Sequence, residues 1–384
     1  MGRIKGLKLD PDFWRGKKVF VTGHTGFKGT WLSLWLHTLG ASVTGYSLDP
    51  PTKPSMYEIC RMDDIVCSYR NDIRDWEALR DAIRKNQPDI VFHLAAQPLV
   101  RESYSAPLDT FSINLMGTVH VLEAVRSALQ EGVKISAVIN VTSDKCYDNQ
   151  EWTWGYRESD RLGGSDPYSA SKAGSELITD SYRRAFFNSK AQGDPVVPVA
   201  SARAGNVIGG GDWSKDRLVP DSVRAILAKK PVVIRYPDAV RPWQHVLEPL
   251  YGYLLLAQHL VQSGQDYAQG WNFGPDYHHS VTVEQFVSRF CAAWGDRAAF
   301  TIENKQDELK EAGQLRLDSS QASRMLEWYP KWNLNTAVAK TVEWYKAYLK
   351  QADMRSFSQM QLNAYMTGEA SWDDHPDRQS SGDL

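Results

Sequence analysis

A short strand pattern that runs directly into a glycine turn and an apolar helix constrains this chain more than any other feature. Residues 18–22 are apolar and β-branched, Gly23, Gly26 and Gly29 follow, and residues 30–39 are largely apolar. Glycines let the backbone approach a pyrophosphate, and a helix N-terminus offers it free N–H groups and a positive dipole. The pattern predicts a nucleotide-binding strand–turn–helix unit, although its spacing is G-x-x-G-x-x-G instead of G-x-G-x-x-G.

An acidic residue after the second predicted strand indicates which dinucleotide binds. Residues 42–48 form this strand, and Asp49 lies 20 residues after Gly29. A carboxylate at this distance binds the ribose hydroxyls of the adenosine half and repels a 2′-phosphate. NAD is therefore expected as the cofactor in preference to NADP. Lys28 argues the other way, and Asp49 could instead be a turn residue before Pro50.

Strand and helix patterns continue to alternate after residue 49. Further strands are predicted to end at residues 71–73 and to cover 89–94, 136–143, 196–202 and 232–235, and helices to cover 75–85, 107–129, 218–229 and 246–262. Repeated βα units with continuous apolar strands predict an α/β fold with a doubly wound parallel sheet of the Rossmann type. Ligands of such sheets bind outside the carboxyl ends of the strands, where Ser143, Asp144 and Lys145 are expected.

The length of 384 residues favours two domains, which we expect to interleave. The predicted boundaries are 1–204 with 240–263 for the dinucleotide-binding domain, 205–239 with 264–368 for a smaller mixed α/β lobe that binds the substrate, and 369–384 for a polar tail that frays.

Composition argues against several other classes of protein. The net charge of −2 leaves no basic footprint for nucleic acid. No apolar run has the length of a membrane span, and the N-terminus has no apolar signal segment, so a cytoplasmic protein without a membrane partner is expected. The four cysteines lack metal-ligand spacing, so free thiols and no metal site are expected.

A tyrosine and a lysine lie one helical turn apart in the second candidate site. Asp166 can cap a helix that begins at Pro167, which places Tyr168 and Lys172 on one face. An ammonium beside a phenol lowers the phenol pKa, and such a pair can act as a general base toward a sugar or alcohol hydroxyl. Taken alone, the motif also fits a helix with an exposed Tyr and Lys.

Together these motifs resemble the extended short-chain dehydrogenase/reductase family. The matching residues are Thr22-Gly23-x-x-Gly26-x-x-Gly29, Asp72-Ile73, His93-Leu94-Ala95-Ala96, Asn114-x-x-Gly117-Thr118, Ser143 and Tyr168-x-x-x-Lys172. The resemblance implies a bound NAD and a nucleotide-sugar substrate. It also implies that Ser143 binds the sugar 4-hydroxyl, that Tyr168 takes its proton, and that Lys172 holds the nicotinamide ribose and tunes Tyr168.

The same resemblance implies a set of cofactor contacts. They are Gly23, Thr25, Gly26, Phe27, Lys28, Gly29, Asp49, Asp72, Ile73, Leu94, Ala95, Ala96, Tyr168 and Lys172. Members of the family commonly form homodimers in which the helices corresponding to 107–129 and to the Tyr168 segment pair. A homodimer or higher homo-oligomer is therefore expected here, although these helices could simply be core.

The residues after Ser143 distinguish two branches of the family. The 4-epimerases carry no acid/base pair there, whereas nucleotide-sugar 4,6-dehydratases carry Asp-Glu; this chain has Asp144-Lys145. That departure and the segment 205–213 resemble the CDP-glucose 4,6-dehydratase branch over nearly the whole chain. The implied reaction oxidises C4 transiently, eliminates water across C5–C6 and returns hydride to C6. Asp144 and Lys145 are the implied acid and base, or else a structural ion pair.

Contacts to the substrate are implied in the second half of the chain. Asn206 follows a predicted strand, and Arg241, with Arg235, would pair with a pyrophosphate, since guanidinium matches phosphate oxygens in bidentate geometry. Arg217 and Leu218 are weaker candidates, and each arginine could be an ordinary surface residue. The resemblance implies deoxysugar biosynthesis for O-antigen lipopolysaccharide. A 4-epimerase and a non-catalytic NAD-binding regulatory protein remain the alternatives.

Overall fold

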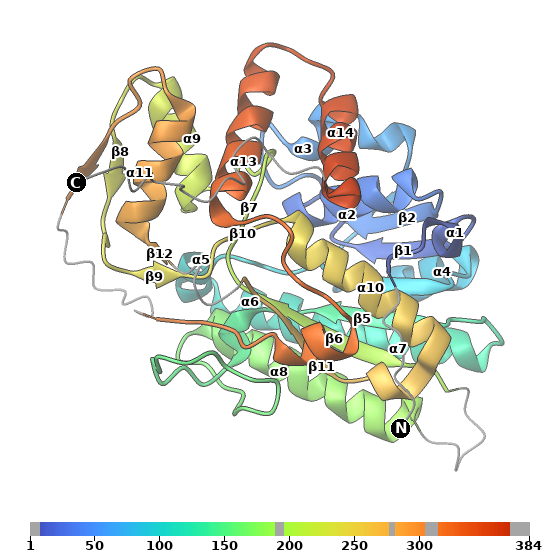
Figure 1. Ribbon diagram of the computed structural model, residues 1–384. Helices are drawn as coiled ribbons and strands as arrows, with labels where there is room; N and C mark the ends of the chain where they lie inside the picture. Colours follow the sequence, from blue (N-terminus) through green and yellow to red (C-terminus); the bar gives the residue numbers. More distant parts are fainter. Residues whose placement is uncertain (1–7, 189–195, 276–280, 304–313, 369–384) are drawn as a thin grey trace, which may run out of the picture.

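A parallel sheet forms the centre of the protein (Figure 1). The computed structural model describes residues 8–188, 196–275, 281–303 and 314–368, and the predicted tail at 369–384 lies outside them. Within these residues the sheet has seven strands, and every neighbouring pair is parallel. Their order is β11 (Gly270–Phe273), β6 (Val199–Ala204), β5 (Ala137–Val141), β4 (Ile90–His93), β1 (Lys18–Thr22), β2 (Ser42–Ser47) and β3 (Cys67–Arg70). The predicted doubly wound α/β fold is confirmed.

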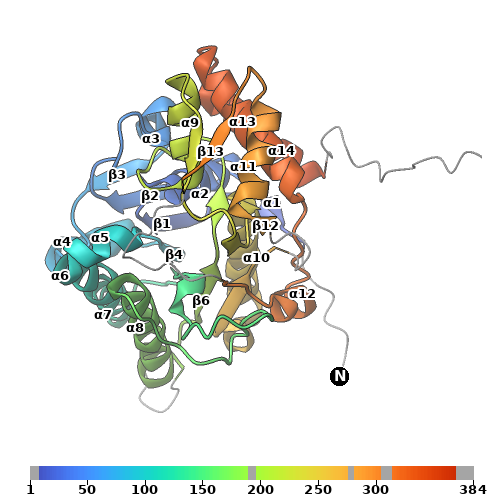
Figure 2. The same ribbon diagram turned by 90° about the vertical axis from the view of Figure 1, so that its left-hand side faces the viewer.

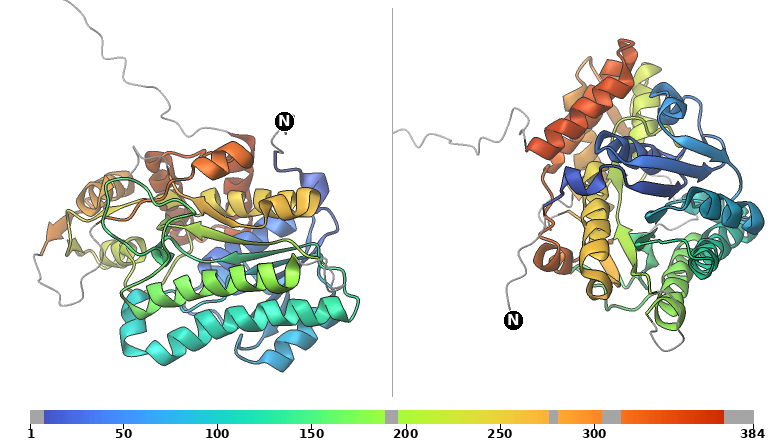
Figure 3. Two further views of the ribbon diagram at one scale, coloured as in Figure 1. Left: turned by 90° about the horizontal axis from the view of Figure 1, so that it is seen from below. Right: turned by 90° about the vertical axis from the view of Figure 1, so that its right-hand side faces the viewer.

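Both faces of this sheet are buried, which explains its continuous apolar strands. Successive side chains point to opposite faces, so Val19 and Val21 enter one core whereas Phe20 enters the other. Helices on both faces cover the sheet (Figures 2 and 3). The first core includes α2 (Phe27–Thr38) and α10 (Leu247–Ser263), and the second includes α4 (Trp76–Asn86), α7 (Gly117–Gln130) and the outer part of α8 (Pro167–Tyr182).

Two predicted helices differ in detail from the observed ones. Helix α2 begins at Phe27, three residues earlier than expected, because the glycine turn feeds directly into it. The expected helix 107–129 is α6 (Pro107–Phe111), a π turn (Ser112–Met116) and α7. Within the π turn the buried amide of Asn114 donates to Gln97 O (3.0 Å) and Ser171 Oγ (2.9 Å). Helix α8 begins as predicted, with Asp166 accepting from Ser169 N at 2.9 Å.

A smaller lobe lies beside the carboxyl edge of the sheet (Figure 1). It contains two short helices and pairs of short strands between residues 207 and 302. These are β7 (Val207–Ile208) with β10 (Gln244–His245), β8 (Val232–Ile234) with β13 (Phe300–Ile302), β9 (Val240–Arg241) with β12 (Val281–Thr282), α9 (Leu218–Leu227) and α11 (Val283–Trp294). The short helices α1 (Pro11–Trp14), α3 (Met56–Ile59) and α5 (Val100–Ser105) belong to the first half of the chain.

The predicted lobe boundary at residue 264 is wrong for part of the chain. Strand β11 pairs with β6 in the central sheet, where Trp271 lies opposite Ala202. Helix α12 (Ser320–Met325) contacts β11. Two more helices follow, α13 (Leu334–Leu349) and α14 (Met354–Thr367), and α14 contacts α2. Strand β6 would otherwise leave its backbone unpaired at the sheet edge, so the fully buried segment around Trp271 is drawn into the sheet.

No helix in the described part of the chain combines the length and the apolar character needed to cross a membrane.

A buried carboxylate at the start of α10 joins this helix to the C-terminal helices. Glu248 is fully buried and accepts from Lys331 N (3.0 Å), Trp332 N (2.7 Å) and Tyr365 Oη (2.6 Å). Burial raises the pKa of Glu248 to about 7 in spite of these hydrogen bonds. The folded protein therefore holds a proton on this carboxyl at pH values where the unfolded chain has lost it.

We predict that Glu248 makes the protein less stable as pH rises. Between the ordinary Glu pKa and about 7 the folded state binds more protons, so the free energy of unfolding falls with increasing pH. The contribution is roughly 3 kcal/mol, since one pKa unit corresponds to about 1.4 kcal/mol. Urea unfolding between pH 5 and 8 should therefore show that the free energy of unfolding of the wild type falls, relative to that of Glu248→Gln, as pH rises. The exposed Glu343→Gln is the control, and a constant difference across pH would contradict the prediction.

Candidate active site

The carboxyl ends of four adjacent strands bring the predicted site segments to one edge of the sheet (Figure 1). The glycine turn follows β1, and Leu94 to Ala96 follow β4. Ser143 to Lys145 follow β5, and Asn206 follows β6. The strand order therefore places them side by side, as expected for a parallel sheet.

The glycine turn fits a dinucleotide pyrophosphate. Gly23 has φ +73°, and a Cβ there would lie 2.7 Å from Ala95 N, so only glycine is accommodated. The N–H groups of Leu94 and Ala95 each donate to Thr22 Oγ1 at 3.1 Å, which fixes the two strand ends together. Gly26 is the N-cap of α2, so the first amide groups of that helix are free of intrahelical partners.

Side chains around the turn also hold the end of β2. Thr25 Oγ1 lies 2.8 Å from Ser47 Oγ and donates to Leu48 O at 2.9 Å. Asp49 follows and is largely exposed, with Arg70 Nε 3.8 Å from its Oδ1. The hydrogen bonds of Thr25 thus hold the turn against the end of β2, directly before the carboxylate expected at the adenosine ribose.

Two other expected cofactor contacts are engaged within the protein. Asp72 pairs with Arg74 at 2.6 Å, and the hydrogen bond from Arg74 holds the pKa of Asp72 below its usual value. The side chain of Ile73 is buried in the core below Gly117, and its carbonyl lies 3.0 Å from His120 Nδ1. The Ile73 side chain therefore packs in the core of the protein.

Ser143, Asp144 and Tyr168 are brought together in the buried centre of the site. Ser143 Oγ donates to Asp144 Oδ1 at 3.0 Å and accepts from Lys145 N at 3.2 Å, which caps the short 3-10 helix Asp144–Cys146. Ser143 also lowers the pKa of Tyr168, so these two side chains lie close together. The loop after β5 and the first turn of α8 thus present a serine, a carboxyl and a phenol to one space.

The pKa values of the Tyr-Lys pair differ from the expectation. Burial raises the pKa of Tyr168 to about 12, and the groups that lower it are Ser143 and Arg217. The phenol pKa is therefore raised in this structure, whereas the pairing with Lys172 predicted a lowered one. Lys172 Nζ instead lies 3.4 Å from Val141 O, and burial lowers the pKa of Lys172 itself to about 8. Removal from water outweighs the attraction that helical spacing suggested.

Asp144 lies in an environment that favours the protonated form of its carboxyl. Burial raises its pKa, although Lys145, Ser143, Lys28 and Arg241 act in the opposite direction. Within the part of the chain that the structure describes, its Oδ2 is buried without a hydrogen-bond partner, and a Cβ on Gly205 would lie 3.0 Å from that oxygen. This free oxygen argues against the alternative of a structural ion pair with Lys145, which is only half-buried.

Three basic side chains lie close enough to the centre to act on it. Burial lowers the pKa of Lys28 to about 8, Arg217 and Lys172 add to that effect, and Asp144 opposes it. Arg217 is the N-cap of α9, with Nη1 3.3 Å from Asp212 Oδ2. Arg241 is buried, and its charge lowers the pKa of Asp144. A residue that binds a ribose 2′-phosphate would lie farther from the catalytic centre than Lys28 does.

The remaining substrate candidates are less central. Arg235 is exposed directly after β8, and its charge lowers the pKa of Asp221 on α9. Leu218 is the half-buried first residue of α9, and Asn206 accepts from Gln244 N at 3.2 Å through its carbonyl.

Sequence reasoning missed a buried polar group directly below the site. Glu176 and Arg203 form a salt bridge at 2.8 Å, and Thr142 donates to Glu176. Two signals were available: Glu176 lies eight residues after Tyr168 on the same helix, and Arg203 is a charged residue inside an apolar strand pattern.

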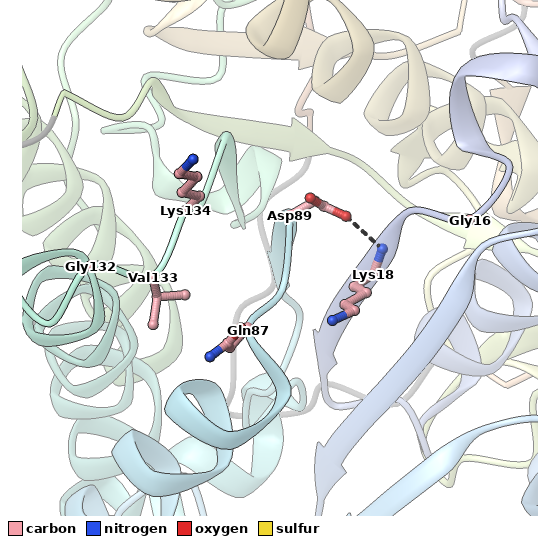
Figure 4. Close-up of a pocket in the computed structure, with 7 residues that line it drawn as sticks. All are labelled: Gly16, Lys18, Gln87, Asp89, Gly132, Val133 and Lys134. Atoms are coloured by element: carbon pink, nitrogen blue, oxygen red, sulfur yellow. Dashed lines mark hydrogen bonds between the residues drawn. The ribbon is translucent and has the colours of Figure 1, made fainter.

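A separate hollow of about 360 Å³ lies at the opposite, amino edge of the sheet (Figure 4). It is lined by Gly16, Lys18, Gln87, Asp89, Gly132, Val133 and Lys134, and Asp89 accepts from Lys18 N at 2.8 Å. None of the predicted site residues lines it. The described residues contain no cluster of three or more His, Cys, Asp or Glu side chains suited to a metal ion.

Comparison with known proteins decides the family. Residues 20–341 match the family described as GDP-mannose 4,6 dehydratase. The chain belongs to this family. It is 51% identical over 359 residues to a CDP-glucose 4,6-dehydratase of Salmonella typhimurium, covering 94% of this chain and 99% of that protein. It is also 26% identical over 346 residues to a probable dTDP-glucose 4,6-dehydratase of Sinorhizobium fredii, covering 85% and 92% of the two chains.

Solved structures of nucleotide-sugar enzymes share the fold. A UDP-glucose-4-epimerase from Stenotrophomonas maltophila with bound NAD and formylated UDP-arabinopyranose superposes with a TM-score of 0.74 at 21% identity, over 88% of this chain and 100% of that one. A dTDP-glucose 4,6-dehydratase from Bacillus anthracis in complex with NAD gives 0.70 at 20% identity, with the same coverage. At these identities the likeness establishes the architecture.

We predict that Asp49 sets the preference for NAD. Asp49→Ser removes the carboxylate that repels a 2′-phosphate and leaves the Arg70 guanidinium at the same place. NAD binding should weaken about tenfold and NADP binding should strengthen, as measured by calorimetry on protein stripped of nucleotide. The exposed Asp63→Ser, which removes the other carboxylate at Arg70, is the control. Unchanged discrimination in Asp49→Ser would contradict this assignment.

Proposed function

We propose that the protein converts CDP-glucose to CDP-4-keto-6-deoxyglucose and water. The proposal rests on the 51% identity, over nearly the full length of both chains, to a CDP-glucose 4,6-dehydratase. The site is consistent with this reaction, because a buried carboxyl with a free oxygen lies beside the serine and the phenol. The glycine turn, the first turn of α2 and Asp49 would hold NAD, which accepts hydride from C4 and later donates it to C6.

Ser143, Tyr168 and Lys172 carry the proton transfer at the sugar 4-hydroxyl. Ser143 orients the hydroxyl, and Tyr168 accepts its proton. Tyr168 can accept this proton only as phenolate, and because burial raises its pKa to about 12, the phenolate is a small fraction of the protein at neutral pH. Lys172 holds the nicotinamide ribose.

Asp144 and Lys145 carry the elimination. Asp144 is the acid toward the departing C6 oxygen, because burial raises the pKa of its carboxyl and its Oδ2 has no hydrogen-bond partner among the described residues. Lys145 removes the C5 hydrogen that the 4-ketone has made acidic, and returns a proton to C5 afterwards. Arg217 and Arg241, with Asn206 and Lys28, surround the substrate pyrophosphate, whereas Arg235 on the lobe surface is a peripheral contact.

The carboxyl of Asp144 separates this proposal from its alternatives. A 4-epimerase exchanges hydride only at C4 and needs no acid beside C6. A non-catalytic NAD-binding protein needs neither Asp144 nor the phenol of Tyr168. Neither alternative explains why an orphaned carboxyl is buried at this point.

A panel of nucleoside-diphosphate-glucoses tests the substrate. Mass spectrometry should show loss of water from CDP-glucose in preference to the UDP, dTDP and GDP sugars. An unchanged sugar, or conversion to CDP-galactose, would reject the proposal. Tyr168→Phe should abolish turnover while NAD remains bound, which a non-catalytic role does not predict.

We predict that Asp144→Asn slows water loss at least about 100-fold, since a positioned general acid contributes roughly 10²–10⁴. Oxidation at C4 should persist, so the absorbance of the reduced dinucleotide should rise on mixing with CDP-glucose and decay slowly. The half-buried Asp148→Asn in the following loop is the control. Nearly intact activity in Asp144→Asn would instead favour the epimerase.

We also propose a cytoplasmic homodimer that acts in deoxysugar synthesis for O-antigen lipopolysaccharide. Large apolar side chains are exposed on adjacent helices: Leu108 (82%), Phe111 and Met116 on α6 and the π turn, and Leu177 (60%) on α8. Helices α6 and α8 contact each other, so these residues lie on neighbouring elements. A second copy of the chain would cover this apolar surface.

The double variant Leu108→Asp/Leu177→Asp should convert the dimer to a monomer, because two charges per chain cannot be buried without partners. Size-exclusion chromatography with light scattering measures the mass. Leu349→Asp, exposed on α13, is the control. A wild-type monomer, or a dimer that persists in the double variant, would refute this interface.

A further inference from the structure

The buried ion pair below the active site connects two segments that carry catalytic groups, the loop after β5 and α8, with strand β6. Glu176 lies one turn beyond Lys172 on α8, and Arg203 lies on β6. Their side chains are 3% and 5% exposed and meet at 2.8 Å. Ser201 Oγ also donates to Glu176 Oε2, at 2.5 Å. Two opposite charges are therefore held away from water with nearly complete hydrogen bonding.

Each partner of the pair reaches one end of the catalytic loop. Glu176 Oε1 accepts from Thr142 Oγ1, and Thr142 immediately precedes Ser143. Arg203 Nη1 donates to the hydroxyl of Tyr147 at 2.7 Å, and Tyr147 lies two residues after Lys145. The segment 143–145 is thus tied on both sides to one ion pair, and through Glu176 to the helix of Tyr168 and Lys172.

Further contacts extend the hydrogen bond between Arg203 and Tyr147 into the central sheet. The guanidinium of Arg203 lies 5.1 Å from the Tyr147 ring centroid. Tyr147 Oη donates to Asn272 Oδ1 on β11 at 2.7 Å, and its ring stacks on Tyr156 at 5.2 Å. The far end of the catalytic loop is therefore anchored on two neighbouring strands, β6 and β11.

We propose that the Glu176–Arg203 pair is a positioning device, which fixes the loop of Ser143, Asp144 and Lys145 in register with Tyr168 and Lys172 on α8. A buried ion pair is poor evidence for stability, because desolvation offsets the attraction between the charges, whereas a single permitted geometry fixes what it holds. The inference rests on the proposed function for its kinetic consequence. Neither residue touches the reacting atoms, so both act through the segments they hold.

The test removes one tie without leaving a charge unpaired. Thr142→Val keeps the shape of the side chain and deletes only the hydroxyl that bonds Glu176, and Thr142→Ser keeps the hydroxyl. We expect Thr142→Val to lower kcat by about 10- to 100-fold with KM changed less than about threefold, because misplaced groups slow the chemistry more than binding. Thr142→Ser should restore most of kcat. Thr341→Val, which removes an equally buried hydroxyl on α13, is the matched control.

Hydrogen exchange measured by mass spectrometry supplies a readout that does not need turnover. Peptides covering 142–147 should exchange faster in Thr142→Val and in Tyr147→Phe than in wild type or Thr341→Val. Wild-type kcat or unchanged exchange in folded Thr142→Val and Tyr147→Phe would overturn the proposal. If wild type converts no nucleotide sugar, the proposed function fails, and the exchange of 142–147 alone decides whether the pair positions the loop.

Discussion

Parallel pairing of the central strands is the constraint on which the rest of this structure depends. Because all seven strands of the described sheet run the same way, their carboxyl ends meet at one edge. The glycine turn, the segment after β4 and the loop after β5 are consequently neighbours, although more than a hundred residues separate the first from the last. The same pairing requires helical crossovers on both faces, and one of these, α8, supplies Tyr168 and Lys172.

Burial at that edge moves the titratable groups toward their neutral forms. It raises the pKa of Asp144 and of Tyr168, and it lowers the pKa of Lys28 and Lys172. Desolvation disfavours a charge of either sign, so acids and bases shift in opposite directions. Glu176 is the exception, since the charge of Arg203 and three side-chain hydrogen bonds outweigh burial and lower its pKa. Burial therefore favours the neutral forms of these site residues, whereas the ion pair below them keeps its charges.

Local patterns predicted the parts of the fold and site that depend on neighbours in the chain. The strand Lys18–Thr22, the cap at Asp166 and the loop after β5 follow from spacing, propensity and hydrogen-bonding side chains within a few residues. Long-range competition decided the exceptions. The segment Gly270–Phe273 joins the sheet because β6 offers an unpaired edge, and Ile73 turns into the core because Gly117 leaves room above it. Neither partner is visible from the segment itself.

The amino-acid pattern alone is enough to predict the βα units, the glycine turn and the residue types available for catalysis, because each is encoded within one helical turn or one strand. How those residues are charged and which of them meet depends on the packed fold. It placed Arg217 and Lys28 near Tyr168 and Asp144, left Arg235 exposed, and put Glu176 against Arg203. Desolvation and Coulomb interactions depend on distances across the packed interior, and packing of distant segments sets those distances.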